Sequence, residues 1–334
     1  MIVAYDDALL AHLGGVRHPE RADRVRVAAA ALAAAGMLAD RVAPRLATID
    51  EIARVHPQSY IELVRRECAA LESNDVADLS TGDTTIDAGS YDSARLASGA
   101  ALAALEATLA RNTASFALVR PPGHHAEPAR GMGFCVFNNA AVAARAFLAN
   151  GGERVLLIDF DYHHGNGTEA LVGSGLSYAS THASPAYPGT GDPSANRITP
   201  GGTLLDLPIA ASGISTEGFA AIWSRALAGL CEAIRPQLIV ISAGYDYAAG
   251  DPVGDLGVDV RVASQLGAAI RAVADTYCNG RAVFVLEGGY DPQTLAASVI
   301  GTIRGYEAGG GTLGTADLRA IPAHTRTLLE AIPA

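Results

Sequence analysis

The chain has 334 residues, of which 49% are hydrophobic, and a formal net charge of -11 at pH 7. This hydrophobic content suffices for a sizeable core and excludes a disordered chain, while the acidic balance argues against a nucleic-acid partner, which would require a basic face. The four cysteines form no Cys-x-x-Cys pair, so neither a disulfide framework nor a thiolate metal site is indicated.

The N-terminal residues MIVAYDD contain no basic segment and no cleavage site. No apolar run reaches the roughly 18 residues that are needed to span a bilayer. We therefore expect a cytoplasmic protein without a membrane partner. Its acidic balance would mildly favour cationic substrates.

Short apolar runs rich in β-branched residues predict strands along the chain. These runs are IVAY near the start, SFALV at 115–119, RVLLIDF at 154–160, LSYAS at 176–180, LLDLPI at 204–209, PQLIVISA at 236–243 and RAVFVL at 281–286. Helical patterns lie between most of them, at 90–112, 138–151, 216–234 and after Asp259.

This alternation predicts a single α/β domain over residues 1–334, with a mostly parallel central sheet and helices on both faces. The segment GYEAGGGTLGT predicts a surface loop, and we expect a C-terminal tail from about residue 307. Four polar clusters, PPGHHAE, DFDYHHGNGT, AGYDYAAGDP and EGGYD, follow four of the predicted strands. Because ligands bind outside the carboxyl ends of parallel strands, the four clusters are expected to face one cleft.

The cluster DFDYHHGNGT predicts metal ligands. Asp159, Asp161 and His163 alternate, so their side chains share one face if the extended conformation continues. Buried carboxylates require a cation or hydrogen bonds. Asp161, His163 and the later Asp246 make a three-ligand set for a borderline metal, with one position open for water. The alternative is a hydrogen-bonded polar strand end without a metal.

His124 and His125 are adjacent, and neighbouring residues on a helix or strand point in different directions. Both can therefore serve one site only from an irregular loop. The alternative is a Gly/Pro loop with incidental histidines.

A second α/β architecture, that of arginase-type amidino-hydrolases, holds two manganese ions with D-x-H-x-D and a later D-x-D. In this chain Gly165 stands two residues after His163, and Ala248 stands two residues after Asp246. Both carboxylates of a second metal are missing, so a single metal is predicted.

The motifs PPGHHA, GFCVFNNAAVAA, IDFDYHHGNGT, PGTGD, SAGYDYAAGDP and EGGY, with HPER at 18–21 and RVHPQSY at 54–60, resemble the histone deacetylase and acetylpolyamine amidohydrolase superfamily. The likeness is closest to its class II branch and bacterial relatives, and it runs from about residue 15 to about residue 305. It implies an arginase/deacetylase-like fold and a zinc-dependent hydrolase that removes an acyl group from an amine.

The resemblance also implies roles for individual residues. Asp161, His163 and Asp246 match the zinc ligands, for which Fe²⁺ or Co²⁺ are possible substitutes. Asp159 would orient His124, and Asn166 would face His125. Imidazole titrates near working pH, so we expect His125 to act as the main general base and acid and His124 to assist electrostatically, although the division between them stays open. Tyr290 matches the tyrosine that donates to the developing oxyanion.

Further residues match the family's substrate tunnel and its structural cation site. Phe134 and Tyr187 match the aromatic walls with Gly133 between them, although relatives more often have phenylalanine at the second wall. Asp83 falls where relatives hold the substrate backbone, but an aspartate in a loop is also a common turn former. Carbonyl groups around Asp159, Asp161 and His163 and near Ser180 and Thr181 match a site for a monovalent cation, usually potassium.

Val253 bears on the substrate. The polyamine-selective relative has a glutamate at this gate, and the extra segment that builds a polyamine channel is also absent from this chain. Both differences favour an acylated lysine or another small N-acyl amine. An acetylpolyamine or metabolite amidohydrolase and a catalytically weak acyl-lysine binding module remain alternatives, and a homo-oligomer is possible.

Overall fold

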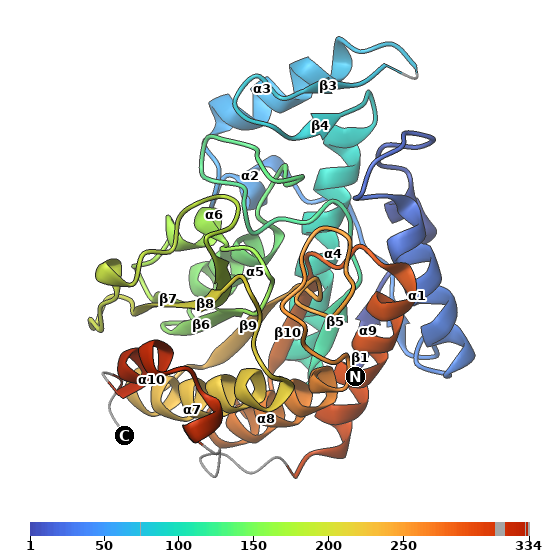
Figure 1. Cartoon of the computed structure of the whole chain (residues 1–334). Coiled ribbons are helices and arrows are strands. Elements are labelled where there is room, and N and C mark those ends of the chain that lie inside the picture. Colours follow the sequence, from blue (N-terminus) through green and yellow to red (C-terminus); the bar gives the residue numbers. More distant parts are fainter. Residues whose placement is uncertain (74, 311–317, 331, 333–334) are drawn as a thin grey trace.

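The computed structural model describes residues 1–73, 75–310, 318–330 and 332. Its centre is an eight-stranded sheet with the order β2-β1-β5-β10-β9-β6-β7-β8, and every neighbouring pair in this described sheet is parallel (Figure 1). Its strands are β1 Ile2–Ala4, β2 Arg41–Val42, β5 Ser115–Ala117, β6 Val155–Asp159, β7 Leu176–Ser184, β8 Leu204–Ala210, β9 Leu238–Ala243 and β10 Ala282–Leu286. The prediction of a parallel sheet is confirmed.

Helices cover both faces of the sheet, as predicted (Figure 1). α4 (Ser90–Arg111) and α5 (Asn139–Ala149) pack against each other on one face. On the other face α1, α9, α8 and α7 pack side by side, and their bounds are Ala22–Ala34, Pro292–Ala308, Val262–Tyr277 and Thr216–Ile234. Because both faces are covered, the strands are apolar along almost their whole length.

Smaller elements complete the described structure. These are η1 (Asp7–Leu10), α2 (Ile49–Ile52), α3 (Gln58–Ala69), α6 (Asn166–Glu169), η2 (Pro193–Ala195), η3 (Leu318–Ala320), α10 (Ala323–Glu330) and the antiparallel hairpin of β3 (Ala77–Asp78) and β4 (Thr85–Ile86). None of these elements was predicted from the sequence; most are too short for a local apolar period to indicate them, whereas α3 is long and amphipathic enough to have been predicted.

The strand order decides where the polar clusters meet. β5, β10, β9 and β6 are consecutive neighbours in the sheet, and each is followed by one of the four clusters. Since all four strands are parallel, their carboxyl ends lie at the same edge. The prediction that the clusters face one site is confirmed.

The extended conformation, the condition for Asp159, Asp161 and His163 to share one face of a strand, does not continue beyond Asp159. β6 ends at Asp159, because the next residues turn around side-chain hydrogen bonds. The Asp161 main-chain N–H donates to Asp159 Oδ1 over 3.1 Å, and the His163 N–H donates to Asp161 Oδ1 over 2.9 Å. These bonds, rather than strand pleating, direct the side chains of Asp161 and His163.

At the C-terminal end, α9 continues through Ala308, past the expected start of the tail. The glycine-rich residues 311–317 lie outside the described part, and α10 packs against α7 and β8. Among the described residues, no helix is both long enough and apolar enough to cross a membrane.

Candidate active site

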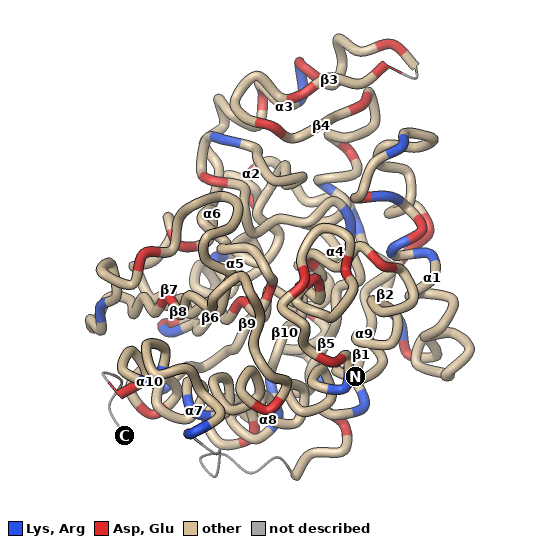
Figure 2. Tube along the Cα trace, viewed as in Figure 1, with Lys and Arg blue, Asp and Glu red and all other residues tan. Residues whose placement is uncertain are grey.

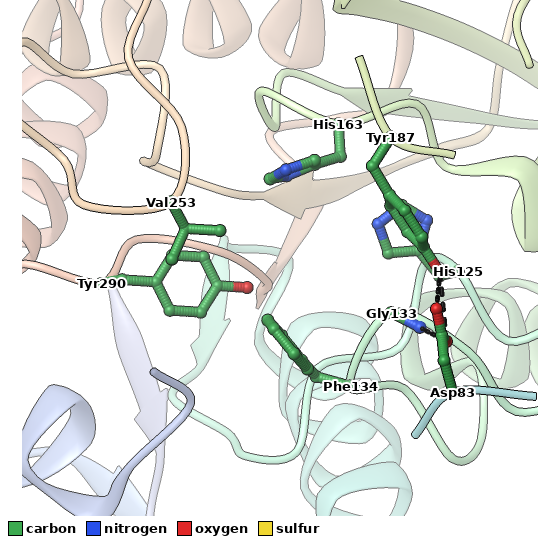
Figure 3. Close-up of a pocket in the computed structure, with 8 residues that line it drawn as sticks. All are labelled: Asp83, His125, Gly133, Phe134, His163, Tyr187, Val253 and Tyr290. Atoms are coloured by element: carbon green, nitrogen blue, oxygen red, sulfur yellow. Dashed lines mark hydrogen bonds between the residues drawn. The ribbon is translucent and has the colours of Figure 1, made fainter. Parts of the chain in front are cut away.

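A pocket of about 360 Å³ lies at the edge where the four clusters meet. Its lining comes from segments far apart in the sequence and consists of Asp83, His125, Gly133, Phe134, His163, Tyr187, Val253 and Tyr290 (Figure 3). All five residues expected to contact substrate are in this lining. The pocket is bounded mainly by apolar and aromatic groups, which suits an alkyl chain carrying a polar end.

Asp161, His163 and Asp246 form a buried group at this pocket, and one donor atom from each lies within 4.8 Å of the others. His163 Nδ1 is 2.9 Å from Asp246 Oδ2 and 3.2 Å from Asp161 Oδ1. Two carboxylate oxygens and one imidazole nitrogen fit a divalent metal of the zinc type. The three residues expected as metal ligands therefore lie together, in a group that could hold such an ion.

Glycines make this convergence possible. A Cβ atom at Gly288 would lie 2.5 Å from Asp246 Oδ2 and 2.6 Å from Asp161 Oδ2, and a Cβ at Gly244 would lie 1.8 Å from Asp161 Oδ2. The remaining oxygens are held by main-chain donors, since Gly288 N–H donates to Asp161 Oδ2 over 2.8 Å and Tyr162 N–H to Asp246 Oδ1 over 2.8 Å. The carboxylates are thus fixed in orientation.

The charges of the group support cation binding. Burial raises the pKa of Asp246 to about 7, and the neighbouring Asp161 adds to the effect. Burial alone would also raise the pKa of Asp161, but His124 and His163 outweigh it and hold that pKa below its usual range. A bound cation would relieve the repulsion between these two buried carboxylates.

The tandem histidines lie in an irregular loop after β5, and each has a different partner. His124 Nδ1 is 3.0 Å from Asp159 Oδ2, and His125 Nδ1 is 2.9 Å from Asn166 Oδ1. Asn166 Nδ2 donates to Glu127 Oε1, so Asn166 Oδ1 is free to accept from His125 Nδ1. The Nε2 atom of a neutral His125 is then an unprotonated acceptor.

Their pKa values move in opposite directions. Burial would lower the pKa of His124, but Asp161 and Asp159 outweigh it and raise this pKa well above its ordinary value. Burial lowers the pKa of His125 well below its ordinary value, and the nearby His124 and His163 lower it further. One ring therefore favours the imidazolium form and the other the neutral form.

Tyr290 follows β10 and reaches the pocket from the side opposite His125. Figure 3 shows its hydroxyl directed into the cavity. Its ring packs edge-on to Phe134 at 5.8 Å between centroids and lies 4.6 Å from the Arg24 guanidinium carbon. Burial raises the pKa of the Tyr290 phenol well above its ordinary value, so the hydroxyl keeps its proton and can donate a hydrogen bond.

The second wall and the rim are joined by hydrogen bonds. The Tyr187 hydroxyl is 3.1 Å from Asp83 Oδ2, and Gly133 N–H donates to Asp83 Oδ1 over 2.9 Å. The Tyr187 ring is edge-on to His125 at 5.2 Å. Asp83, on the β3–β4 hairpin, thus ties both walls together, which explains how a tyrosine is accommodated at this wall.

Sequence reasoning missed Asp251, which positions two parts of the lining. Asp251 Oδ2 accepts from Tyr290 N–H over 2.6 Å, and Asp251 Oδ1 accepts from Val253 N–H over 2.9 Å. This side chain is almost fully buried. The only sequence signal was its place within the AGYDYAAGDP cluster.

A buried ionic network behind the site was also missed. Glu20 pairs with Arg120 over 2.9 Å and 2.7 Å and with Arg24 over 2.9 Å. Arg24 donates to the Gly289 carbonyl over 2.6 Å and to the Glu287 carbonyl over 2.5 Å. Glu287 Oε2 in turn accepts from the main chain of Gly123 and His124. The HPER motif contains one member of this network, Glu20, but the motif alone did not indicate its partners.

The residues expected at a structural cation site lie beside one another, because Asp159 pairs with Ser180 in the β6–β7 register. Their side chains have other partners. Ser180 Oγ is 3.1 Å from His182 Nδ1, and Thr181 Oγ1 accepts from Trp223 Nε1 over 3.1 Å. The expected cation ligands there are carbonyl oxygens, so potassium stays a prediction.

A second buried group of possible ligands contains His164, His182 and Asp206. Its histidines already have partners. His182 Nε2 is 3.1 Å from the Gly191 carbonyl, and His164 Nδ1 is 2.8 Å from Thr190 Oγ1. This group therefore links β7 and β8 to the PGTGD loop through hydrogen bonds.

The position that would supply a second metal carboxylate has no room for one. A Cβ at Gly165 would lie 2.3 Å from Asp159 Oδ2 and 2.5 Å from Tyr178 Oη. Ala248, at the other position, is buried. The geometry supports a site for one metal.

Comparison with known proteins identifies the class to which this fold and pocket belong. Residues 18–306 match the histone deacetylase domain family. A probable deacetylase from Archaeoglobus fulgidus is 33% identical over 296 residues, which cover 86% of this chain and 80% of the archaeal protein. The histone deacetylase-like amidohydrolase of Pseudomonas aeruginosa is 38% identical over 253 residues, which cover 73% of this chain and 64% of that protein.

Among solved structures, the HDA15 HD domain superimposes with a TM-score of 0.85 at 30% identity, covering 99% of this chain and 94% of that chain. The chain also matches three plant histone deacetylases, and the matched regions cover 61%, 56% and 64% of the lengths of those proteins. The chain belongs to the histone deacetylase family, which is a family of hydrolytic deacetylases. The resemblance and the fold class expected from its motifs are confirmed.

Proposed function

We propose that this protein is a zinc-dependent amidohydrolase that removes an acetyl or other short acyl group from an acylated lysine or a similar N-acyl amine. The observation that carries the proposal is one apolar pocket whose lining combines a histidine of the buried Asp161–His163–Asp246 group, a histidine of the tandem pair, and Tyr290. Metal, base and oxyanion donor together supply the activated water, the proton transfers and the oxyanion stabilisation that amide hydrolysis needs.

Asp161, His163 and Asp246 would hold the metal, which when bound polarises the acyl carbonyl and lowers the pKa of a water molecule. A second, structural cation, potassium, would stabilise the chain around Asp159 and Ser180. The proposed cellular setting is the cytoplasm, with no nucleic acid or membrane as partner.

The histidines would divide the proton transfers. His125 has a lowered pKa and a neutral amide partner, so its Nε2 can accept a proton from the attacking water and return it to the leaving amine. His124, kept near the imidazolium form by Asp161 and Asp159, would contribute positive charge close to the developing oxyanion.

Tyr290 provides the first test. Tyr290→Phe removes one hydroxyl from a buried ring, so the variant is expected to fold and to keep its metal. Its rate of acetyl-lysine peptide hydrolysis should fall by about 10²–10³, the usual effect of losing one oxyanion donor. The comparison is kcat at equal zinc content, measured by elemental analysis. Full activity in this variant would remove Tyr290 from the mechanism.

The proposed ligands are tested by their metal content rather than by rate alone. Asp246→Ala and His163→Ala are each expected to lose stoichiometric zinc after dialysis, because two remaining ligands bind too weakly. His164→Ala is the matched control, since His164 lies next to His163 but belongs to the hydrogen-bonded second group. Wild-type zinc occupancy in either ligand variant would contradict the assignment.

The apolar gate at Val253 supports acyl-lysine over acetylpolyamine substrates. A matched pair of an acetyl-lysine peptide and N-acetylspermidine tests this, with faster turnover of the peptide as the expected result. Hydroxamate binding without turnover of any N-acyl compound would instead favour a binding module.

A further inference from the structure

The rim of the pocket carries acidic and basic groups on opposite sides. Asp83 lies on the β3–β4 hairpin on one side. On the other side a second cleft of about 400 Å³ is lined by Arg17, His18, Pro19, Arg21, Pro252, Val253 and Tyr290. We call this second cleft the arginine shelf. It shares Val253 and Tyr290 with the substrate pocket, so the two cavities adjoin.

The segment that forms the shelf is anchored to the pocket. The His18 ring packs edge-on to Phe134, with 4.7 Å between the ring centroids. His18 Nδ1 also accepts from the main-chain N–H of Glu20 over 3.1 Å, and the Glu20 side chain belongs to the buried ionic network. Arg17 and Arg21 therefore project from a held segment at the mouth of the pocket.

Both arginines are exposed, and their charges are poorly compensated. Arg17 has no ion pair or hydrogen bond within the described part of the chain. Arg21 is attracted by Asp291, but that carboxylate also caps α9 by accepting from Thr294 N–H over 2.8 Å. Among the residues that the structure describes, no acidic one lines the shelf. Asp and Glu outnumber Lys and Arg in the chain, whose net charge is -11, and Figure 2 shows how these residues are distributed along the trace. A cleft lined by two arginines is therefore unexpected.

From this arrangement we infer that the arginine shelf is a second substrate subsite, which binds a carboxylate carried by the substrate next to the acylated amine. The preferred substrates are then acyl-lysines with an adjacent aspartate or glutamate. This inference rests on the proposed function and adds a substrate class to it. The same cations disfavour acetylpolyamines, whose remaining amines are positively charged.

The test uses acetyl-lysine peptides with one glutamate, placed either directly before or directly after the acetyl-lysine. Each is compared with the same peptide in which glutamine replaces the glutamate. The chain has no lysine, so an amine-reactive dye detects the released substrate amine against one protein amine, the N-terminus. At low ionic strength kcat/KM should favour a glutamate peptide by about 3- to 10-fold, the range for one or two exposed ion pairs. Salt at about 0.5 M should abolish most of this preference.

In the double variant Arg17→Gln/Arg21→Gln the preference should fall below about twofold, while the rate on the glutamine peptide stays unchanged. The matched control is Arg26→Gln, an exposed arginine on α1 that pairs with Asp23 and does not line the shelf. This control should keep the full preference. Equal rates on both peptides, or a preference that survives in the double variant, would overturn the inference.

A binding measurement distinguishes a failure of this inference from a failure of the proposed function. Anisotropy of the same peptides, fluorescently labelled, on zinc-loaded Tyr290→Phe protein reports the glutamate preference while turnover is slowed by about 10²–10³. If no peptide is hydrolysed by the wild type, the proposed function fails, but the anisotropy ratio still decides whether the shelf reads a carboxylate. If peptides are hydrolysed without a charge preference, only the shelf is wrong.

Discussion

At the scale of single residues, Gly133 shows how closely the pocket is built. Gly133 has φ +56 and the next residue, Phe134, has φ +67, both in the left-handed region. A Cβ at Gly133 would lie 2.3 Å from His125 Cδ2 and 3.0 Å from Tyr187 Cε1. The glycine therefore lets the loop pass directly against the proposed base.

We expect Gly133→Ala to displace His125 and to lower kcat/KM for an acetyl-lysine peptide by about 10² or more, as shifts of about 1 Å in reacting groups do. Gly151→Ala is the matched control, because Gly151 also has a positive φ but nothing lies near its Cβ position. Because both positions have a positive φ, each variant should lose about 1 kcal/mol of unfolding free energy to backbone strain, as measured by urea unfolding. Equal activities would show that contact with His125 is unimportant.

At the scale of elements, the site depends on how the loops after β5 and β10 are joined. Glu20, just before α1, links Arg120 at the start of the tandem-histidine loop with Arg24, which holds the carbonyls of the loop carrying Tyr290. All three side chains are fully buried. Burial would raise the pKa of Glu20, but Arg120 and Arg24 outweigh it and lower the pKa to about 2.

Glu20→Gln is expected to destabilise the protein by about 3–5 kcal/mol, because two guanidinium groups lose their buried counter-charge. Urea unfolding at neutral pH measures the change. Glu62→Gln serves as control, since Glu62 pairs with Arg65 on the surface, and its unfolding midpoint should not move measurably. A Glu20→Gln midpoint equal to the wild type would show that the network contributes nothing.

At the scale of the whole molecule, buried histidines should make the fold sensitive to mild acid. Burial lowers the pKa of His12, His56, His164 and His182 to about 4, against about 6.5 in an unfolded chain. Between these values the unfolded chain binds more protons, so the stability present above about pH 6.5 is lost as the pH falls towards 4.

Each such histidine should lower the free energy of unfolding by about 2 kcal/mol between neutral pH and about pH 5. Urea unfolding at the two pH values measures the total, and His56→Gln isolates one contribution because glutamine cannot be protonated. That variant should lose less stability on acidification than the wild type, whereas His324→Gln, at an exposed position, should behave like the wild type. Identical acid losses in His56→Gln and the wild type would contradict the argument.

Much of the fold and of the candidate site could be predicted from the sequence, because local pattern reports burial and period. Apolar runs in the sequence predicted β6, β9 and β10, and helical patterns predicted α4 and α7, without knowledge of what these elements pack against. The ligand types at Asp161, His163 and Asp246 were equally visible, since unusual polar residues directly follow apolar strands. Residues whose role depends on a distant partner, such as Asp251, carried no comparable local signal.

By itself, then, the sequence determined the class of the fold, the succession of its main elements and the residues proposed to bind metal and transfer protons, because these follow from local chemistry. Only the tertiary structure decided that β5, β10, β9 and β6 are neighbours, that Glu20 joins arginines 4 and 100 residues away, and that Arg17 and Arg21 border the pocket. The physical reason is that long-range pairing is set by how helices and strands pack together, and no local period encodes it.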